Sequence, residues 1–67
     1  MDICRKVGRN VRQLREEKGW SQEEFAAEVG LHRTYVSGIE RGVRNPTVKI
    51  VAKLAEKLGV QPQQLLK

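Results

Sequence analysis

The chain has 67 residues, of which 39% are hydrophobic and 31% charged, and its 13 Lys and Arg exceed its eight Asp and Glu to give a net charge of +5. This length and composition predict one small folded domain, and the positive charge favours an anionic partner. One cysteine and one histidine exclude an intramolecular disulfide and a four-ligand zinc site, and the lack of a long apolar run predicts a cytoplasmic protein.

A first helix is predicted over residues 2–18. Its apolar stripe recurs at intervals of three and four residues, at Ile3, Val7, Val11 and Leu14. Asp2 suits the positive end of the helix dipole, and Gly19 after Lys18 suits the end of the helix. Cys4 flanks the stripe, and we expect it to pack as a small hydrophobic residue.

The second predicted helix has the clearest start signal in the chain. Ser21 is followed three residues later by Glu24, the spacing of a capping box in which each side chain accepts a hydrogen bond from the other residue's backbone N–H. Trp20 before the cap and Phe25 in the first turns of the helix form a hydrophobic staple. Gly30 ends the helix.

Three further helices are predicted after short connections. A tight turn after Gly30 leads into a helix that stops at Gly42. The next helix begins near Thr47 and ends at Gly59, and a short fifth helix begins near Pro62. Five helices and no strand pattern predict a single compact all-α domain that comprises all 67 residues.

A tight glycine turn joins the second and third predicted helices, which alone would fit an ordinary helical hairpin, but the residue spacing at about residues 22–41 indicates more. Counted from Gln22, the defining residues are Ala26 at the fifth position, Gly30 at the ninth, Val36 at the fifteenth and Ile39 at the eighteenth. The small residue allows the two helices to approach closely, and the glycine takes a positive φ without strain. The two branched residues hold the third helix in the core.

These residues resemble the phage repressor/Cro helix-turn-helix family, also called the xenobiotic-response-element family. The matched positions are 21–26, 30, 36–42, 44–47, 54–55 and 58–60. The resemblance covers about residues 9–66, and residues 32–37 are in addition similar to recognition helices of restriction–modification controller proteins. It implies a repressor-like five-helix DNA-binding domain whose third helix lies in the major groove.

The resemblance and the charge together predict a sequence-specific transcriptional regulator that binds double-stranded DNA. A monomer of this size offers little contact surface, so we expect a homodimer on a palindromic operator. We predict the dimer interface at Val60, Leu65 and Leu66, and closure of a small core is the alternative role of these residues. No cofactor and no small-molecule ligand are expected.

Three side chains of the third helix are the predicted base contacts: Arg33, Thr34 and Ser37. On a helical wheel that turns the apolar residues inward, positions 34, 37, 38 and 41 face outward, with 33 and 35 on the flanks. Arg33 can pair with guanine O6 and N7 at once, which is worth about 1–3 kcal/mol of discrimination. Gly38 on the outward side either lets DNA approach closely or has no function.

Four residues are the predicted phosphate contacts: Gln22, Tyr35, Arg44 and Asn45. Gln22 begins a helix, where free N–H groups and the dipole attract a phosphate. Arg44 and Asn45 lie in the loop after the third helix, where the family's pattern supports them, and Tyr35 has a hydroxyl donor. Such contacts fix the position of a protein on DNA without selecting a sequence.

Arg15 and Glu40 are interpreted as structural, because the resemblance implies a partly buried ion pair between the first and third helices.

Functions other than DNA binding fit the sequence less well. The sequence contains no nucleophile with a paired base, no phosphate-binding glycine loop and no metal cluster, so we predict that the protein is not an enzyme. No helix has the wide apolar face opposite basic residues that membrane binding needs. The alternative function is a protein-binding module of the same fold, an antitoxin or a repressor partner, against which Arg33 and Arg44 argue.

Overall fold

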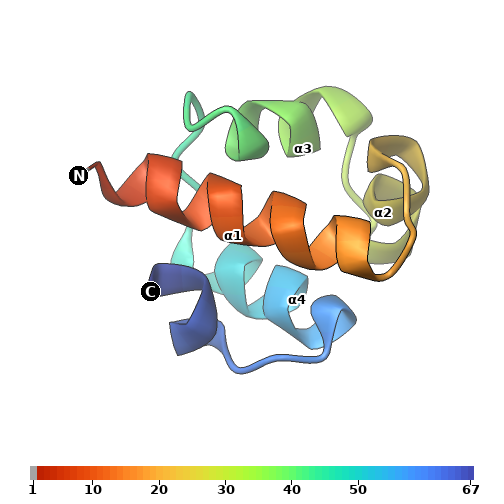
Figure 1. Ribbon diagram of the computed structural model, residues 1–67. Coiled ribbons are helices and arrows are strands. Elements are labelled where there is room, and N and C mark those ends of the chain that lie inside the picture. Colours follow the sequence, from red (N-terminus) through yellow and green to blue (C-terminus); the bar gives the residue numbers. More distant parts are fainter. Residues whose placement is uncertain (1) are drawn as a thin grey trace.

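The computed structural model describes residues 2–67, and in this range it contains helices and no β-strand (Figure 1). The elements in chain order are α1 (Ile3–Glu17), α2 (Gln22–Val29), α3 (Arg33–Glu40), α4 (Val48–Leu58) and the 3-10 helix η1 (Pro62–Leu66). In Figure 1, α1 lies between α3 on one side and α4 with the C-terminal segment on the other, and α2 closes one end. The helix-turn-helix of α2 and α3 is thus supported by α1 and α4.

The predicted boundaries of α1, α2 and α4 are confirmed, and the residues that cap these helices are in place, whereas α3 ends at Glu40, before the predicted stop at Gly42. α1 begins and ends within one residue of the prediction. In the capping box of α2, the Glu24 N–H donates to Ser21 Oγ at 3.0 Å and the Ser21 N–H donates to Glu24 Oε1 at 2.8 Å. Gly30 ends α2 at a φ of 72°, which glycine adopts without strain. Thr47 Oγ1 accepts from the Ile50 N–H at 3.2 Å at the start of α4.

The predicted fifth helix is wrong in type, because residues 62–66 form a 3-10 helix and the described chain has four α-helices. Five residues are too few to offset the cost of an α-helical nucleus, whereas 3-10 geometry is common in segments this short. The Gln61 N–H donates to Gln64 Oε1 at 2.8 Å, which tightens this turn. Asn10 of α1 donates to the Leu65 carbonyl at 3.0 Å and attaches η1 to α1.

The core draws buried hydrophobic residues from all five elements: Val7, Val11, Phe25, Ala26, Val29, Val36, Ile39, Leu54, Ala55, Leu58 and Leu65. Trp20 stacks on Phe25 with ring centroids 5.7 Å apart, as the predicted staple requires. Leu65 is completely buried, so it closes the core and is not accessible to a second chain. This corrects one residue of the predicted dimer interface. Val60 is half-buried against the core, and Leu66 is exposed.

α1 and α3 cross at Gly8 with their backbones in contact. Gly8 is buried, and a Cβ atom on it would contact the Ile39 carbonyl oxygen and lie 2.7 Å from the Glu40 carbonyl oxygen. No side chain fits at this crossing, so the glycine sets how closely the two helices approach. Nothing in the spacing of the first predicted helix reveals this contact, because a glycine inside a helix is by itself only an unfavourable residue.

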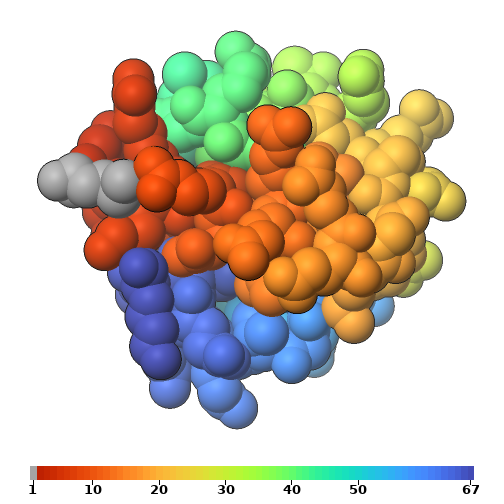
Figure 2. All heavy atoms as spheres, viewed as in Figure 1, coloured from red at the N-terminus to blue at the C-terminus, as the bar shows by residue number. Residues whose placement is uncertain are grey.

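The outer side of α1 is polar and solvated. Figure 2 shows it across one face of the molecule, between the segments of α3 with its following loop and those of the C-terminal part. Arg5, Arg9 and Arg12 of α1 are exposed, and Arg12 pairs with Glu16 at 3.3 Å. Neither α1 nor any other helix within residues 2–67 combines the length and the apolar character needed to cross a bilayer.

Candidate nucleic-acid interface

α3 presents a polar side to solvent and an apolar side to the core. Val36 and Ile39 are buried, whereas Arg33 and Thr34 are exposed and Ser37 is half-buried. The eight residues of α3 make a helix about 12 Å long, comparable to the width of the major groove of B-DNA. The three predicted base contacts therefore lie together on the side of α3 that faces away from the core.

The polar side chains at the two ends of α3 differ in the hydrogen bonds that they make. His32 is the N-cap residue but makes no side-chain capping hydrogen bond, so it does not replace the Ser or Thr usual at this position. Near the other end, Arg41 Nε donates to Ser37 Oγ at 3.4 Å. The Ser37 hydroxyl accepts in this bond, so its own proton is available for an external acceptor.

Gly38 does not face outward, which corrects both roles predicted for it. It is buried, and a Cβ atom on it would overlap Arg44 Cγ and lie 3.4 Å from Arg44 Nε. The side chain of Arg44 therefore lies across Gly38. The N–H groups of Val43 and Arg44 donate to the Gly38 carbonyl at 3.0 and 3.2 Å and fold the loop back onto α3. The separation of Gly38 and Arg44 along the chain follows no helical period, so the pattern of residues gives no signal of this contact.

A buried ion pair joins α1 to α3. Arg15 Nε donates to Glu40 Oε2 at 2.7 Å and Arg15 Nη2 donates to Glu40 Oε1 at 3.1 Å, and the two side chains are 8% and 2% exposed. Arg15 Nη1 also donates to the Trp20 carbonyl at 2.6 Å. The hydrogen bond to Glu40 raises the pKa of Arg15 above its ordinary value and outweighs the lowering by desolvation. The predicted structural role of this pair is confirmed.

Gln22 is attached to the same ion pair from the start of α2. Its Nε2 donates to Glu40 Oε1 at 3.1 Å, so this nitrogen is not available to a ligand in this arrangement. The capping box occupies the N–H groups of Ser21 and Glu24. The backbone N–H of Gln22 therefore remains the donor that this residue offers at the positive end of the α2 dipole.

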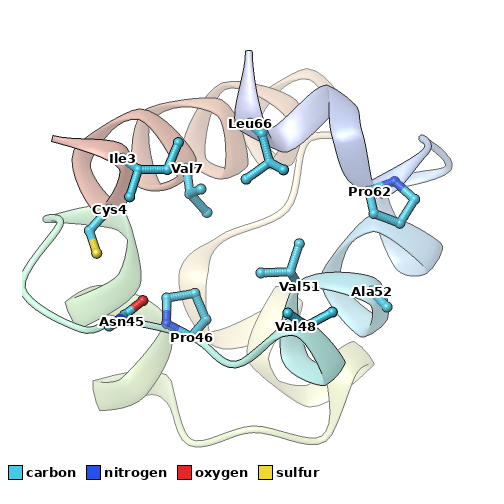
Figure 3. A pocket seen from close by; sticks show the side chains of 10 residues that line it. All are labelled: Ile3, Cys4, Val7, Asn45, Pro46, Val48, Val51, Ala52, Pro62 and Leu66. Atoms are coloured by element: carbon cyan, nitrogen blue, oxygen red, sulfur yellow. The ribbon is translucent and has the colours of Figure 1, made fainter. Parts of the chain in front are cut away.

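The other predicted phosphate contacts lie in different surroundings. Arg44 and Asn45 are exposed, whereas Tyr35 is half-buried and packs against the core. Arg44 rests on α3 through Gly38, but Asn45 lines a groove between α1 and α4 (Figure 3). The structure thus brings Gln22 and Arg44 against α3 and leaves Asn45 on the neighbouring surface.

An apolar groove of about 260 Å³ lies between the start of α1, the start of α4 and η1. Figure 3 shows the side chains that line it: Ile3, Cys4, Val7, Asn45, Pro46, Val48, Val51, Ala52, Pro62 and Leu66. Ile3, Val48 and Leu66 are 53%, 87% and 46% exposed, so three exposed large hydrophobic side chains meet at this groove. Cys4 is half-buried at this groove, and residues 2–67 contain no group of three or more His, Cys, Asp or Glu suited to a metal ion.

The similarity to known proteins covers the same helices. The HTH_3 helix-turn-helix family model matches residues 11–65. The chain belongs to this helix-turn-helix family. The helix-turn-helix protein described here is 52% identical over 60 residues to the control protein C.BamHI of Bacillus amyloliquefaciens, and the match covers 88% of this chain and 74% of that relative.

Two solved structures of helix-turn-helix proteins have the same fold. The restriction–modification controller protein C.AhdI of Aeromonas hydrophila superposes with a TM-score of 0.87 at 45% identity, over 92% of this chain and 94% of the other. SinR, a master regulator for biofilm formation solved in complex with DNA, superposes with a TM-score of 0.86 at 35% identity, over 91% and 98%. The resemblance to repressor-like and controller proteins is confirmed, and these relatives are regulators rather than enzymes.

Proposed function

We propose that this helix-turn-helix protein is a sequence-specific transcriptional regulator that binds double-stranded DNA with α3 in the major groove. The observation that carries the proposal is the exposed polar side of α3, which is backed by buried residues on a chain of net charge +5. The complex of the relative SinR with DNA supports it. A helix fixed by its buried side can hold polar side chains rigidly toward base edges.

Arg33, Thr34 and Ser37 are the proposed base contacts. The exposed guanidinium of Arg33 stands at the start of α3, the part of a recognition helix that meets base edges in this docking geometry. Its paired donors match guanine O6 and N7. Thr34 offers a hydroxyl and a methyl group, which suit a polar base edge or a thymine methyl, and Ser37 offers its hydroxyl proton.

Gln22, Arg44, Asn45 and Tyr35 are the proposed phosphate contacts, and they differ in how well they are placed. Gln22 supplies its backbone N–H at the start of α2. Arg44 supplies an exposed charge that rests on α3. Asn45, which lines the apolar groove, and Tyr35, which packs on the core, are the less well placed of the four, and we assign them to phosphates at the edge of the interface. Together these contacts set the position of α3 in the groove.

The size of the domain supports a homodimer on a palindromic operator. Its longest extent is 28 Å, and the described chain has one helix-turn-helix. Successive major-groove faces of B-DNA recur about 34–36 Å apart, so one copy contacts one half-site and a second copy is needed for the next. Two copies related by a two-fold axis meet a palindrome with equivalent contacts.

The apolar groove is the proposed dimer surface. Of the exposed large hydrophobic residues, Ile3, Val48 and Leu66 line the groove, so it concentrates apolar surface at one place. Contiguous exposed apolar surface is typical of interaction sites, and homodimer interfaces are more apolar than other protein surfaces. Leu66 belongs to both the predicted interface and this groove, whereas Val60 is half-buried against the core and is not among the residues that line the groove.

Selection of binding sites from random duplex DNA tests the proposal, with the recovered complexes sized at moderate salt. A short palindrome bound by two copies is the expected result. Recovery of no motif, together with weak and strongly salt-dependent binding, would overturn sequence-specific recognition and favour the protein-binding module. A motif bound by a single copy would overturn the homodimer alone.

Substitution of Arg33 and Arg44 is expected to separate base recognition from phosphate binding. Arg33→Ala should remove about 1–3 kcal/mol of discrimination at one base pair of each half-site. Arg44→Ala should weaken binding to all sequences alike and reduce the dependence on salt. Repeating the site selection with each variant measures the difference. An equal loss of affinity for all DNA sequences with Arg33→Ala would contradict the role of Arg33 as a base contact.

Leu66→Glu is expected to weaken dimerisation while leaving the monomer folded. Burial of a leucine side chain is worth about 1.5–3 kcal/mol, which corresponds to a roughly ten- to hundredfold rise in the dimer Kd. Analytical ultracentrifugation without DNA measures this change. Ala27→Glu adds the same charge at an exposed position of α2 and is the matched control. An unchanged Kd with Leu66→Glu would remove the groove from the proposed interface.

A further inference from the structure

Arg44 lies across α3 in a place that glycine leaves open. Gly38 is buried beneath the aliphatic part of the Arg44 side chain, and a Cβ atom on Gly38 would overlap Arg44 Cγ. The loop backbone is fixed to the same residue, because the N–H groups of Val43 and Arg44 donate to the Gly38 carbonyl at 3.0 and 3.2 Å. Both the backbone and the side chain of Arg44 therefore rest on one residue of α3.

The charge of Arg44 has no counter-charge in the part of the chain that the structure describes. The ion pairs there join Arg12 to Glu16, Arg15 to Glu16 and Arg15 to Glu40. Glu40 is the acidic residue of α3, and its oxygens already accept hydrogen bonds from Arg15 and Gln22. The exposed guanidinium of Arg44 therefore keeps its donors for an external anion.

We propose that Gly38 is a positioning residue that seats Arg44 beside the base-contacting side of α3, where the guanidinium binds one backbone phosphate. Gly38 itself contacts neither base nor phosphate. The inference rests on the proposed DNA-binding function and adds the reason why glycine stands in the middle of α3. A long side chain loses rotamer freedom when it binds a phosphate. Packing it in one position in the unbound protein removes part of that entropic cost.

DNA binding by Gly38→Ala, Arg44→Ala and the double variant tests the proposal. The probe is the duplex selected from random DNA by the unmodified protein. One phosphate contact contributes about −0.9 to the slope of log K against log salt, or roughly eightfold in affinity at 0.1 M salt. Arg44→Ala should lose this contact, and Gly38→Ala should lose most of it. In the Arg44→Ala background, Gly38→Ala should cause no further loss.

Two outcomes of this comparison of the single and double variants would overturn the proposal. Equal losses from Gly38→Ala in both backgrounds would mean that DNA approaches residue 38 directly. No loss of DNA affinity from Gly38→Ala in either background would mean that the position of Arg44 does not depend on the absence of a side chain at residue 38. Lys57→Ala removes an exposed cation of α4 and is the control for charge alone, with an unchanged salt slope expected. The unfolding temperature of Gly38→Ala should not fall, because alanine favours a helix more than glycine.

A second measurement needs neither DNA nor a variant. In the unbound protein, nuclear Overhauser contacts between the Hα protons of Gly38 and the Hγ protons of Arg44 are expected from the packing of the two residues. Their absence would overturn the seating of Arg44 even if DNA binding is established. If site selection instead returns no motif while these contacts are observed, the proposed function fails and the packing does not.

Discussion

Glu40→Ala is expected to reduce the free energy of unfolding by about 3–5 kcal/mol, because it leaves the buried guanidinium of Arg15 without a counter-charge. It also removes the acceptor of the Gln22 side chain at the start of α2. At roughly 0.05–0.15 kcal/mol per residue, a domain of 67 residues has about 3–10 kcal/mol in total. Urea titration followed by circular dichroism measures the loss. If the total stability of the unmodified domain lies at the lower end of that range, Glu40→Ala is expected to be partly unfolded even without urea.

The exposed pair of Arg12 and Glu16 is the matched control for Glu40→Ala. Its side chains are 65% and 55% exposed, so Arg12→Ala, which leaves Arg15 and its partners in place, should cost less than about 1 kcal/mol. An equal effect of the two substitutions would contradict the structural role of the buried pair. The double variant Arg15→Met/Glu40→Leu should be more stable than Glu40→Ala, since no charge is then buried without a partner.

Gly8→Ala is expected to destabilise the domain by about 1–3 kcal/mol, although alanine alone favours a helix by roughly 0.5–1 kcal/mol over glycine. The added Cβ would meet backbone carbonyl oxygens of Ile39 and Glu40, which cannot move aside as a flexible side chain can. α1 and α3 must therefore separate, which weakens the packing between them. Thermal and urea unfolding measure the change.

Gln13→Ala provides the comparison for Gly8→Ala at an exposed position of α1. Its effect should lie within about 0.5 kcal/mol of zero, because it alters no buried contact. A stabilised Gly8→Ala protein, as helix propensity alone predicts, would show that the close approach of α1 and α3 does not depend on the absence of a side chain at residue 8.

Features that depend on neighbouring residues were predicted well from the sequence. The capping box of Ser21 and Glu24 and the staple of Trp20 and Phe25 act across a few residues, so their spacing is enough to locate the start of α2. The buried and exposed sides of α3 also follow from its period at every position but Gly38, because Val36 and Ile39 determine which way the helix faces. The candidate base contacts could therefore be placed on the surface before the structure was known.

Features that depend on distant contacts were not predictable in this way. Gly8 and Gly38 are required by atoms of another segment, and a glycine within a helix has the same appearance whether or not such atoms are present. The adjacent residues Leu65 and Leu66 are equally apolar, yet the turn of η1 buries the first and exposes the second. The arrangement of the apolar groove likewise depends on how η1 meets the starts of α1 and α4.

The two sides of α3 use different residues. Val36, Ile39 and Glu40 hold the helix in the domain, while Arg33 and Thr34 are exposed. A substitution among the exposed residues leaves the packing of the helix unchanged, and most such surface changes alter stability little. Under the proposed function, a protein of this design can change its DNA sequence preference in evolution through single substitutions on the exposed side while the buried side of α3 stays unchanged.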